Sequence, residues 1–253
     1  MQKSILIFLL STFILSQGYY NEGDLVDEAD QFYSVPTCFA GNGYFLQEGW
    51  KLADWSGEFN GGNYNVIFMD IQAGWCPPCI DWAISYGDIH YEYADNNHVK
   101  FITALFEGDP DGNDDDSWPT CAEWGQLPGT NFDNLVSAQI VDDNDFGLFN
   151  MFNSQNSIPS TVWLDHEMRV HKLGNNLNAW HINYNINEML ESCGSLCDPL
   201  IGDVDGDGLL NIVDIIIIVD FIINDIYIQN ADANNDNSVD IFDILILVNS
   251  ILG

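Results

Sequence analysis

The sequence predicts an α/β domain followed by a small all-α domain built from a repeat. Between residues 45 and 192, short apolar runs rich in strand-forming residues alternate with segments of helical character. Beyond residue 198, residues 203–222 and 232–251 align at an offset of 29 with 8 identities in 20 positions. The 253 residues leave room for both domains at roughly 150 residues per domain.

The charge of the chain excludes two classes of partner. The chain carries 39 acidic and 5 basic residues, which gives a formal net charge of −34. A polyanion of this kind is repelled by phosphate backbones and by anionic lipid headgroups. We therefore exclude nucleic-acid binding and electrostatic docking to membranes as functions.

Residues 1–18 have the pattern of a signal peptide. Lys3 supplies a positive start, Ile5–Leu15 is an apolar run, and Ser16-Gln17-Gly18 offers small residues at a cleavage site. The apolar run is shorter than the roughly 20 residues that a membrane span needs. We expect an exported protein that is secreted, periplasmic or held at the cell surface, without membrane insertion after cleavage.

The elements of the first domain follow an N-terminal extension. Residues 19–44 are polar and give no strong periodic signal, so we interpret them as that extension, with room for one short strand. Apolar runs bounded by turn residues predict buried strands. Up to residue 192 the patterns predict a strand over Val66–Ile71, a helix over Ile80–Tyr93, a strand over Val99–Phe106, paired strands over Ser160–Leu164 and Arg169–Leu173, and a closing helix over Ala179–Ser192, before a linker over residues 193–198.

Six cysteines in an exported chain indicate disulfide chemistry, because disulfides persist outside the cytoplasm. Cys76 and Cys79 form a CxxC pair. The other four can pair in three ways, and the sequence does not choose among them. These four residues are Cys38, Cys121, Cys193 and Cys197.

The CxxC pair has two interpretations, as half of a metal site or as a redox dithiol. A zinc site needs two further ligands at short spacing, and Cys193 and Cys197 lie beyond the last helix of the domain. The redox interpretation accounts for more of the neighbourhood. A strand ends near Trp75, so Cys76 lies at a helix N-terminus, where unpaired N–H groups and the helix dipole stabilise a thiolate. Cys79, one turn later, is placed to resolve a mixed disulfide.

The segment Trp75-Cys76-Pro77-Pro78-Cys79 resembles the active site of the thioredoxin superfamily, in the form found in exported members. Asp70 stands six residues before Cys76, where that family carries a buried acid that assists proton transfer. Ile158-Pro159-Ser160-Thr161 resembles the family's cis-proline segment, which faces the dithiol and pairs with the substrate backbone.

This resemblance covers about residues 45–192 and implies an α/β thioredoxin-like fold with a central mixed sheet flanked by helices. It implies a protein-disulfide oxidoreductase acting on protein thiols or disulfides without an organic cofactor. Cys76 and Cys79 would exchange disulfides, Asp70 would relay a proton, Pro159 would shape the substrate groove, and Trp75 would cover the dithiol.

Two departures from the family pattern leave the direction of the redox reaction open. Ser160 follows the proline, and Asp81 lies close behind Cys79, where an acid raises a cysteine pKa. The alternative function is a non-catalytic binding or scaffold component in which the thioredoxin fold is a recognition domain. For the remaining cysteines, our interpretation pairs Cys38 with Cys121 and Cys193 with Cys197.

The repeat in residues 199–253 predicts two calcium loops. Oxygen-bearing side chains recur at loop positions 1, 3, 5, 9 and 12, and position 7 offers a backbone carbonyl, as a hard cation that takes six to eight oxygens requires. Position 6 holds Gly208 and Asn237, which tolerate a left-handed backbone. The predicted ligands of the two ions are Asp203, Asp205, Asp207, Leu209, Asn211 and Asp214 in the first loop, and Asp232, Asn234, Asp236, Ser238, Asp240 and Asp243 in the second.

The loops resemble those of a dockerin, because position 12 is Asp and no helix is expected before either loop. Dockerins attach enzymes to cohesin-bearing scaffolds in a calcium-dependent manner, so the resemblance implies a cohesin-like partner. Helices are predicted over Ile212–Ile223 and Ile241–Leu252, and both are apolar nearly all round. Positions 10 and 11 are apolar in both loops, which indicates a partner specificity different from that of loops with Ser and Thr. They hold Ile212, Val213, Ile241 and Phe242.

Overall fold

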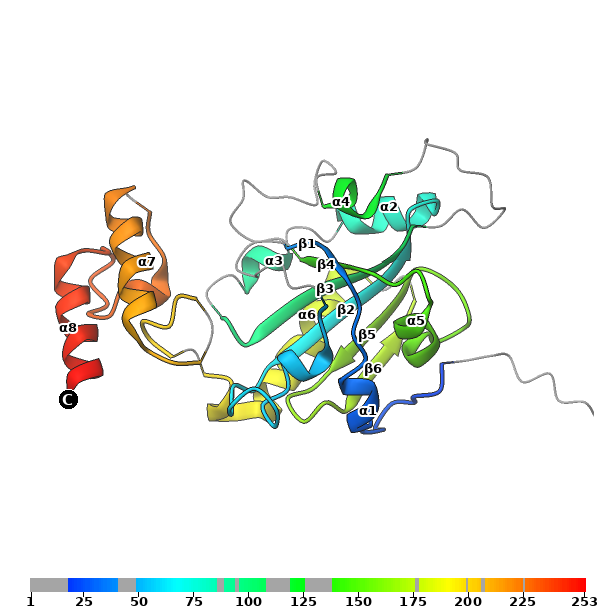
Figure 1. Cartoon of the computed structure of the whole chain (residues 1–253), viewed down its shortest axis with the longest axis horizontal. Coiled ribbons are helices and arrows are strands. Elements are labelled where there is room, and N and C mark those ends of the chain that lie inside the picture. Colours follow the sequence, from blue (N-terminus) through cyan, green and yellow to red (C-terminus); the bar gives the residue numbers. More distant parts are fainter. Residues whose placement is uncertain are drawn as a thin grey trace, which may run out of the picture.

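A computed structural model gives the three-dimensional structure of the chain (Figure 1). The structure describes residues 18–40, 49–85, 89–93, 96–107, 119–125, 138–175, 178–198, 200–205, 208–224 and 226–253. Most of the expected signal peptide and the expected ligand Asp207 lie outside these residues.

A six-stranded mixed sheet forms the centre of the first domain, in the order β1-β4-β3-β2-β5-β6. The neighbouring strands β4, β3 and β2 are parallel to one another, and all other pairings are antiparallel. A mixed α/β sheet with β2 leading into the CxxC segment is the arrangement that the resemblance implied. The strands are β1 (Thr37–Phe39), β2 (Val66–Ala73), β3 (Val99–Phe106), β4 (Gln139–Asp142), β5 (Ser160–Leu164) and β6 (Val170–Gly174).

Helices pack on both faces of this sheet. Alternate residues of β2 point to opposite faces, because side chains alternate along a strand. Phe68 packs in one cluster with residues of α3 and α6, while Met69 packs in another with residues of α5 and the N-terminal segment. The helices of this domain are α1 (Glu28–Gln31), α2 (Pro77–Ser85), α3 (Ile89–Glu92), α4 (Cys121–Trp124), α5 (Gly147–Phe152) and α6 (Ala179–Cys193), with short 3-10 helices η1 (Leu52–Asp54) and η2 (Gly194–Leu196).

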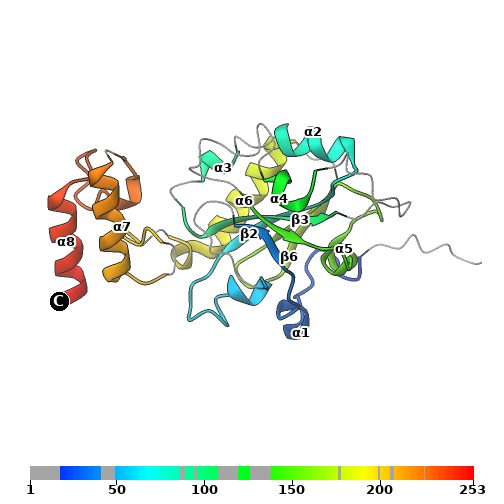
Figure 2. The same cartoon turned by 45° about the horizontal axis from the view of Figure 1, so that its top comes forward.

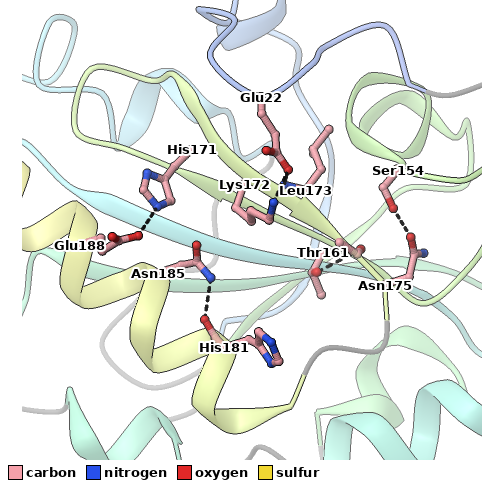
Figure 3. Close-up of polar contacts among 11 residues, drawn as sticks. Glu22, Ser154, Thr161, His171, Lys172, Leu173, Asn175, His181, Asn185 and Glu188 are labelled. Carbon is pink, nitrogen blue, oxygen red and sulfur yellow. Dashed lines mark hydrogen bonds and ion pairs between the residues drawn. The ribbon is translucent and has the colours of Figure 1, made fainter.

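The N-terminal segment is part of the core of this domain. Tyr20, Val26 and Val35 are buried in the cluster that covers one face of the sheet, and β1 adds a strand at the edge. Glu22 forms an ion pair of 2.8 Å with Lys172 of β6 (Figure 3). The segment therefore belongs to the same compact unit as the residues that follow it.

The expected strands and helices are confirmed, with small shifts at their ends. The predicted strand from Val66 continues to Ala73, and the last strand begins at Val170 rather than Arg169. The helix expected over Ile80–Tyr93 is found as α2 and α3, between which residues 86–88 lie outside the described residues. The sequence patterns did not predict α1, α4, α5 or β4, which are at most six residues long.

The C-terminal repeat forms a pair of helices, α7 (Ile212–Ile223) and α8 (Ile241–Leu252), with the bounds that were predicted. They lie side by side at one end of the molecule, away from the sheet, in both views (Figures 1 and 2). Ile215, Ile218, Ile244 and Leu247 form the core between them, and the 3-10 helix η3 (Gln229–Ala231) precedes the second loop. Within the described residues, no helix is both long and apolar enough to span a bilayer.

Candidate functional site

The CxxC pair is a disulfide at the start of α2. The Cys76 and Cys79 sulfurs are 2.06 Å apart. The backbone carbonyl of Cys76 accepts hydrogen bonds from the Cys79 and Ile80 amides, at 2.9 and 3.3 Å, and so begins the helix. Cys79 is fully buried, whereas Cys76 is 4 % exposed. Cys76 is therefore slightly more exposed than Cys79, and it lies at the helix end where a thiolate is stabilised.

A close backbone contact fixes the turn that leads into Cys76. A Cβ atom on Gly74 would lie 2.9 Å from the carbonyl oxygen of Pro119, so only glycine fits there without a shift. Cys121 follows two residues after Pro119 and is disulfide-bonded to Cys38. This confirms the expected pairing, and the third disulfide joins Cys193 to Cys197. Cys121 lies in the same apolar cluster as the CxxC sulfurs, so the Cys38–Cys121 bridge holds one wall of the site.

Asp70 lies on β2, which runs directly into the CxxC turn. Its side chain is 2 % exposed. Thr103 of the neighbouring strand donates a hydrogen bond of 2.8 Å to one carboxylate oxygen, and the side-chain amide of Gln72 contacts the other. Two strands thus hold one buried carboxyl group in a fixed position.

The segment before β5 packs against the disulfide. The peptide bond between Ile158 and Pro159 is cis, as the resemblance implied. Ile158 and Trp75 both pack against the apolar cluster that contains Cys76 and Cys79. The structure therefore brings the cysteines, Trp75 and the cis-proline segment together at one end of the sheet, with Asp70 buried on β2.

Asn175 also organises this site, and the sequence analysis did not identify it. It follows β6, and its side-chain amide donates hydrogen bonds to the carbonyl oxygen of Pro159 at 2.7 Å and to the Ser160 hydroxyl at 3.1 Å. Figure 3 shows its contact with Ser154. An asparagine after a strand is common in loops, so no local signal distinguishes it.

The first repeat loop gathers three carboxylates, of which Asp203 and Asp214 are buried. Oxygens of Asp203, Asp205 and Asp214 all lie within 4.8 Å of one another, the only such acidic group among the residues that the structure describes. Asp214 is fully buried, and it accepts the Val204 and Asn211 amides at 2.9 and 2.8 Å. Burying several carboxylates together is costly unless a cation neutralises them, so this donor set fits a hard cation.

The second loop repeats the hydrogen-bond pattern of the first. The fully buried Asp243 accepts the amides of Asn234 and Asp240, at 3.1 and 2.8 Å. The Asn237 amide donates to Asp232 at 2.8 Å, as the Gly208 amide donates to Asp203 at 2.9 Å in the first loop. Gly208 and Asn237 both have positive φ, at 81° and 65°, as expected for position 6.

In comparisons with known proteins, the chain matches solved structures only. No protein-family model and no curated relative matches the chain. It is similar to a structure assigned as the thiol:disulfide interchange protein DsbE of Chlorobium tepidum, with 12 % identity and a TM-score of 0.44, over 69 % of this chain and 99 % of that one. It is also similar to a secreted Mycobacterium tuberculosis disulfide oxidoreductase homologous to Escherichia coli DsbE, with 12 % identity and a TM-score of 0.41, over 64 % of this chain and 99 % of that one. A thioredoxin-like protein from Aeropyrum pernix matches with 19 % identity and a TM-score of 0.43, over 64 % of this chain and 91 % of that one.

Proposed function

We propose that the protein is an exported thiol–disulfide oxidoreductase that exchanges its Cys76–Cys79 pair with protein substrates. The observation that carries this proposal is the packing of Ile158, next to the cis-proline, against the cluster that holds the CxxC disulfide. The sequence resemblance to exported thioredoxin-like proteins supports export and protein substrates.

In the reducing direction, the Cys76 thiolate attacks a substrate disulfide. A mixed disulfide forms between Cys76 and one substrate sulfur, and the other leaves as a thiolate. The Cys79 thiolate then attacks the Cys76 sulfur and releases the second substrate thiol, with Asp70 accepting the Cys79 proton. Two electrons and two protons reach the substrate, and the Cys76–Cys79 disulfide remains. The oxidising direction is the reverse of these steps.

Insulin reduction with dithiothreitol as donor tests this proposal. The Cys79→Ser variant should accumulate a mixed disulfide through Cys76, and Cys76→Ser should lose turnover. A Cys193→Ser/Cys197→Ser variant is the matched control, since this disulfide lies at the end of α6, away from the CxxC cluster. If the Cys76→Ser variant works as well as the wild type, or if the wild type has no activity, the scaffold function replaces the catalytic one.

We further propose that residues 199–253 form a dockerin-like module that binds two calcium ions and tethers the enzyme to a cohesin-like partner. The predicted ligands that the structure describes would hold the ions through side-chain oxygens and the Leu209 and Ser238 carbonyls. Calcium would neutralise the buried carboxylates and so fold the loops.

The outer surface of the helix pair supports a partner interface. Apolar side chains at equivalent positions of the two repeats are exposed, which is unusual for a soluble surface. Ile216 and its counterpart Leu245 are 63 % and 58 % exposed. The corresponding pairs are Ile212 with Ile241, Val213 with Phe242, and Ile223 with Leu252.

Two measurements test the module. Calorimetric titration of the full chain with calcium should give two bound ions, with magnesium as the control cation. Purified cohesin domains should then retain the chain in calcium and release it in EGTA, and the Ile216→Asp/Leu245→Asp variant should not be retained. A chain that binds no calcium contradicts the first part, and retention that ignores EGTA contradicts the second.

A further inference from the structure

We infer that Asn175 is a positioning residue that holds the cis-proline segment in the shape needed to bind an extended protein substrate. This inference rests on the proposed exchange function, and it adds a residue outside the CxxC and cis-proline motifs. Asn175 lies 16 residues after Pro159 in sequence, at the end of β6.

The side chain of Asn175 connects several atoms of one short segment. Its amide nitrogen lies 2.7 Å from the Pro159 carbonyl oxygen, 3.1 Å from each of the hydroxyl oxygens of Ser157 and Ser160, and 3.4 Å from the Ser157 carbonyl oxygen. Its carbonyl oxygen contacts the Ser154 hydroxyl (Figure 3). An amide has both donors and an acceptor on one rigid plane, so asparagine serves both sides of this contact.

A second hydrogen bond within the segment depends on the same arrangement. The Ser160 hydroxyl donates to the Ser157 carbonyl at 2.7 Å, which leaves the hydroxyl oxygen to accept from Asn175. Ser160 is fully buried and Pro159 is buried, whereas Ser157 is exposed. The network therefore ties the exposed start of the segment to its buried end, and Ile158 lies between them.

The position of Ile158 makes this network relevant to substrate binding. The side chain of Ile158 packs against the cluster that contains the CxxC disulfide, so the segment that carries Ile158 lies beside that cluster. A substrate strand that pairs with this backbone needs the peptide groups held in one orientation, because binding to a disordered segment requires ordering it first. Asn175 fixes the peptide group between Pro159 and Ser160, because it donates a hydrogen bond to the Pro159 carbonyl oxygen.

An Asn175→Asp variant tests the inference. A carboxylate has nearly the same shape but no N–H donor, so both amide hydrogen bonds are lost. We expect KM for a protein substrate to rise roughly ten-fold, with kcat within about two-fold of the wild type. The reduction potential of the Cys76–Cys79 pair against glutathione should not change, because Asn175 does not contact the sulfurs. The Asn187→Asp variant, which makes the same charge change at an exposed site on α6, should behave as the wild type.

Hydrogen exchange of residues 157–161 separates the possible failures. Faster exchange in Asn175→Asp with an unchanged KM would overturn the positioning role. A changed reduction potential would show that Asn175 acts on the dithiol instead. If Asn175→Asp does not fold, Ser160→Ala removes one acceptor of the network and should raise KM in the same direction by a smaller factor. A wild type without exchange activity would reject the proposed function and this inference together, whatever the exchange pattern of the segment.

Discussion

The side-chain amide of Asn97 donates a hydrogen bond of 2.6 Å to the backbone carbonyl of Asp203. Asn97 precedes β3 in the sheet domain, and Asp203 is the first residue of the first repeat loop. Asn230 donates to the same carbonyl, also at 2.6 Å, from within the C-terminal module. In addition, a Cβ atom on Gly208 would lie 2.9 Å from the Asn63 side chain. The first loop is thus held from both domains.

This contact predicts that Asn97→Ala weakens one of the two proposed calcium sites. Loss of one partly buried hydrogen bond to Asp203 should cost about 1 kcal/mol, or roughly five-fold in affinity for the first loop. The second loop has no partner in the sheet domain among the described contacts, so its affinity should not change. Calorimetric titration of the full chain measures both sites. An equal loss of calcium affinity at both sites would mean that the two loops fold as one unit.

The loop aspartates at position 12 are expected to matter most for ion binding. Asp214→Asn keeps one acceptor oxygen but removes the charge, and it should reduce affinity at one site by roughly thirty-fold, or about 2 kcal/mol. Asp243→Asn should do the same at the other site.

Removing calcium with EGTA should unfold the C-terminal module while insulin reduction continues. Circular dichroism measures the unfolding. If insulin reduction is lost together with the helical signal of the C-terminal module, the sheet domain depends on that module.

Replacing Asp70 by Asn should slow the resolution of the mixed disulfide. The amide cannot accept a proton, and a positioned general base contributes roughly a hundred-fold or more to a proton transfer. We expect at least a ten-fold slower single turnover at pH 7, with accumulation of the Cys76-linked intermediate in rapid-quench samples. Thr103→Val, which keeps the carboxylate but removes one donor, is the control and should have a smaller effect. Equal rates in wild type and Asp70→Asn would remove Asp70 from the mechanism.

His90 should make the sheet domain less stable in mild acid. It is 5 % exposed and packs 4.4 Å from the Phe101 ring, and burial lowers its pKa to about 4. The unfolded chain binds a proton at about pH 6.5, whereas the folded state binds it only near pH 4. Stability from this residue is therefore fully present above pH 6.5 and falls by up to about 3 kcal/mol as the pH drops to 4.

Urea denaturation of the wild type and His90→Phe between pH 4 and 7 isolates this contribution. The phenyl ring removes the titrating group but fills a similar volume beside Phe101. The difference in free energy of unfolding between the two proteins should change by about 3 kcal/mol across this range, in favour of the variant at low pH. A difference that is independent of pH would show that His90 is not the group responsible.

The sequence predicted the elements that have strong local patterns. The apolar runs of β2 and β3 and the repeated helices α7 and α8 were identified because burial and periodicity appear within a few neighbouring residues. In contrast, α5 follows Phe146, whose φ of 55° is left-handed, and the side chain of Asp143 accepts hydrogen bonds from amides in the first turn of the helix. The segment before it contains several acidic residues and has the composition of a turn.

The parts of the site that depend on long-range contacts were harder to predict. The CxxC pair and the cis-proline segment have sequence motifs, so their residues were named from the sequence. Asn175 acts through Pro159, which is distant in the chain. Val26 packs in one buried cluster with Met168, to whose carbonyl its amide donates a hydrogen bond, and no local pattern predicts this contact. Such relationships arise from strand pairing, which a single sequence does not specify.

The disulfide between Cys193 and Cys197 shortens the connection between the sheet domain and the C-terminal helix pair. It closes the chain just after α6, and only five residues separate Cys197 from Asp203. Five residues reach at most roughly 18 Å when fully extended. A scaffold that captured the helix pair would hold the CxxC disulfide at a high local concentration relative to neighbouring proteins on the same scaffold. Selection of substrates would then depend on which proteins are assembled nearby as well as on the groove itself.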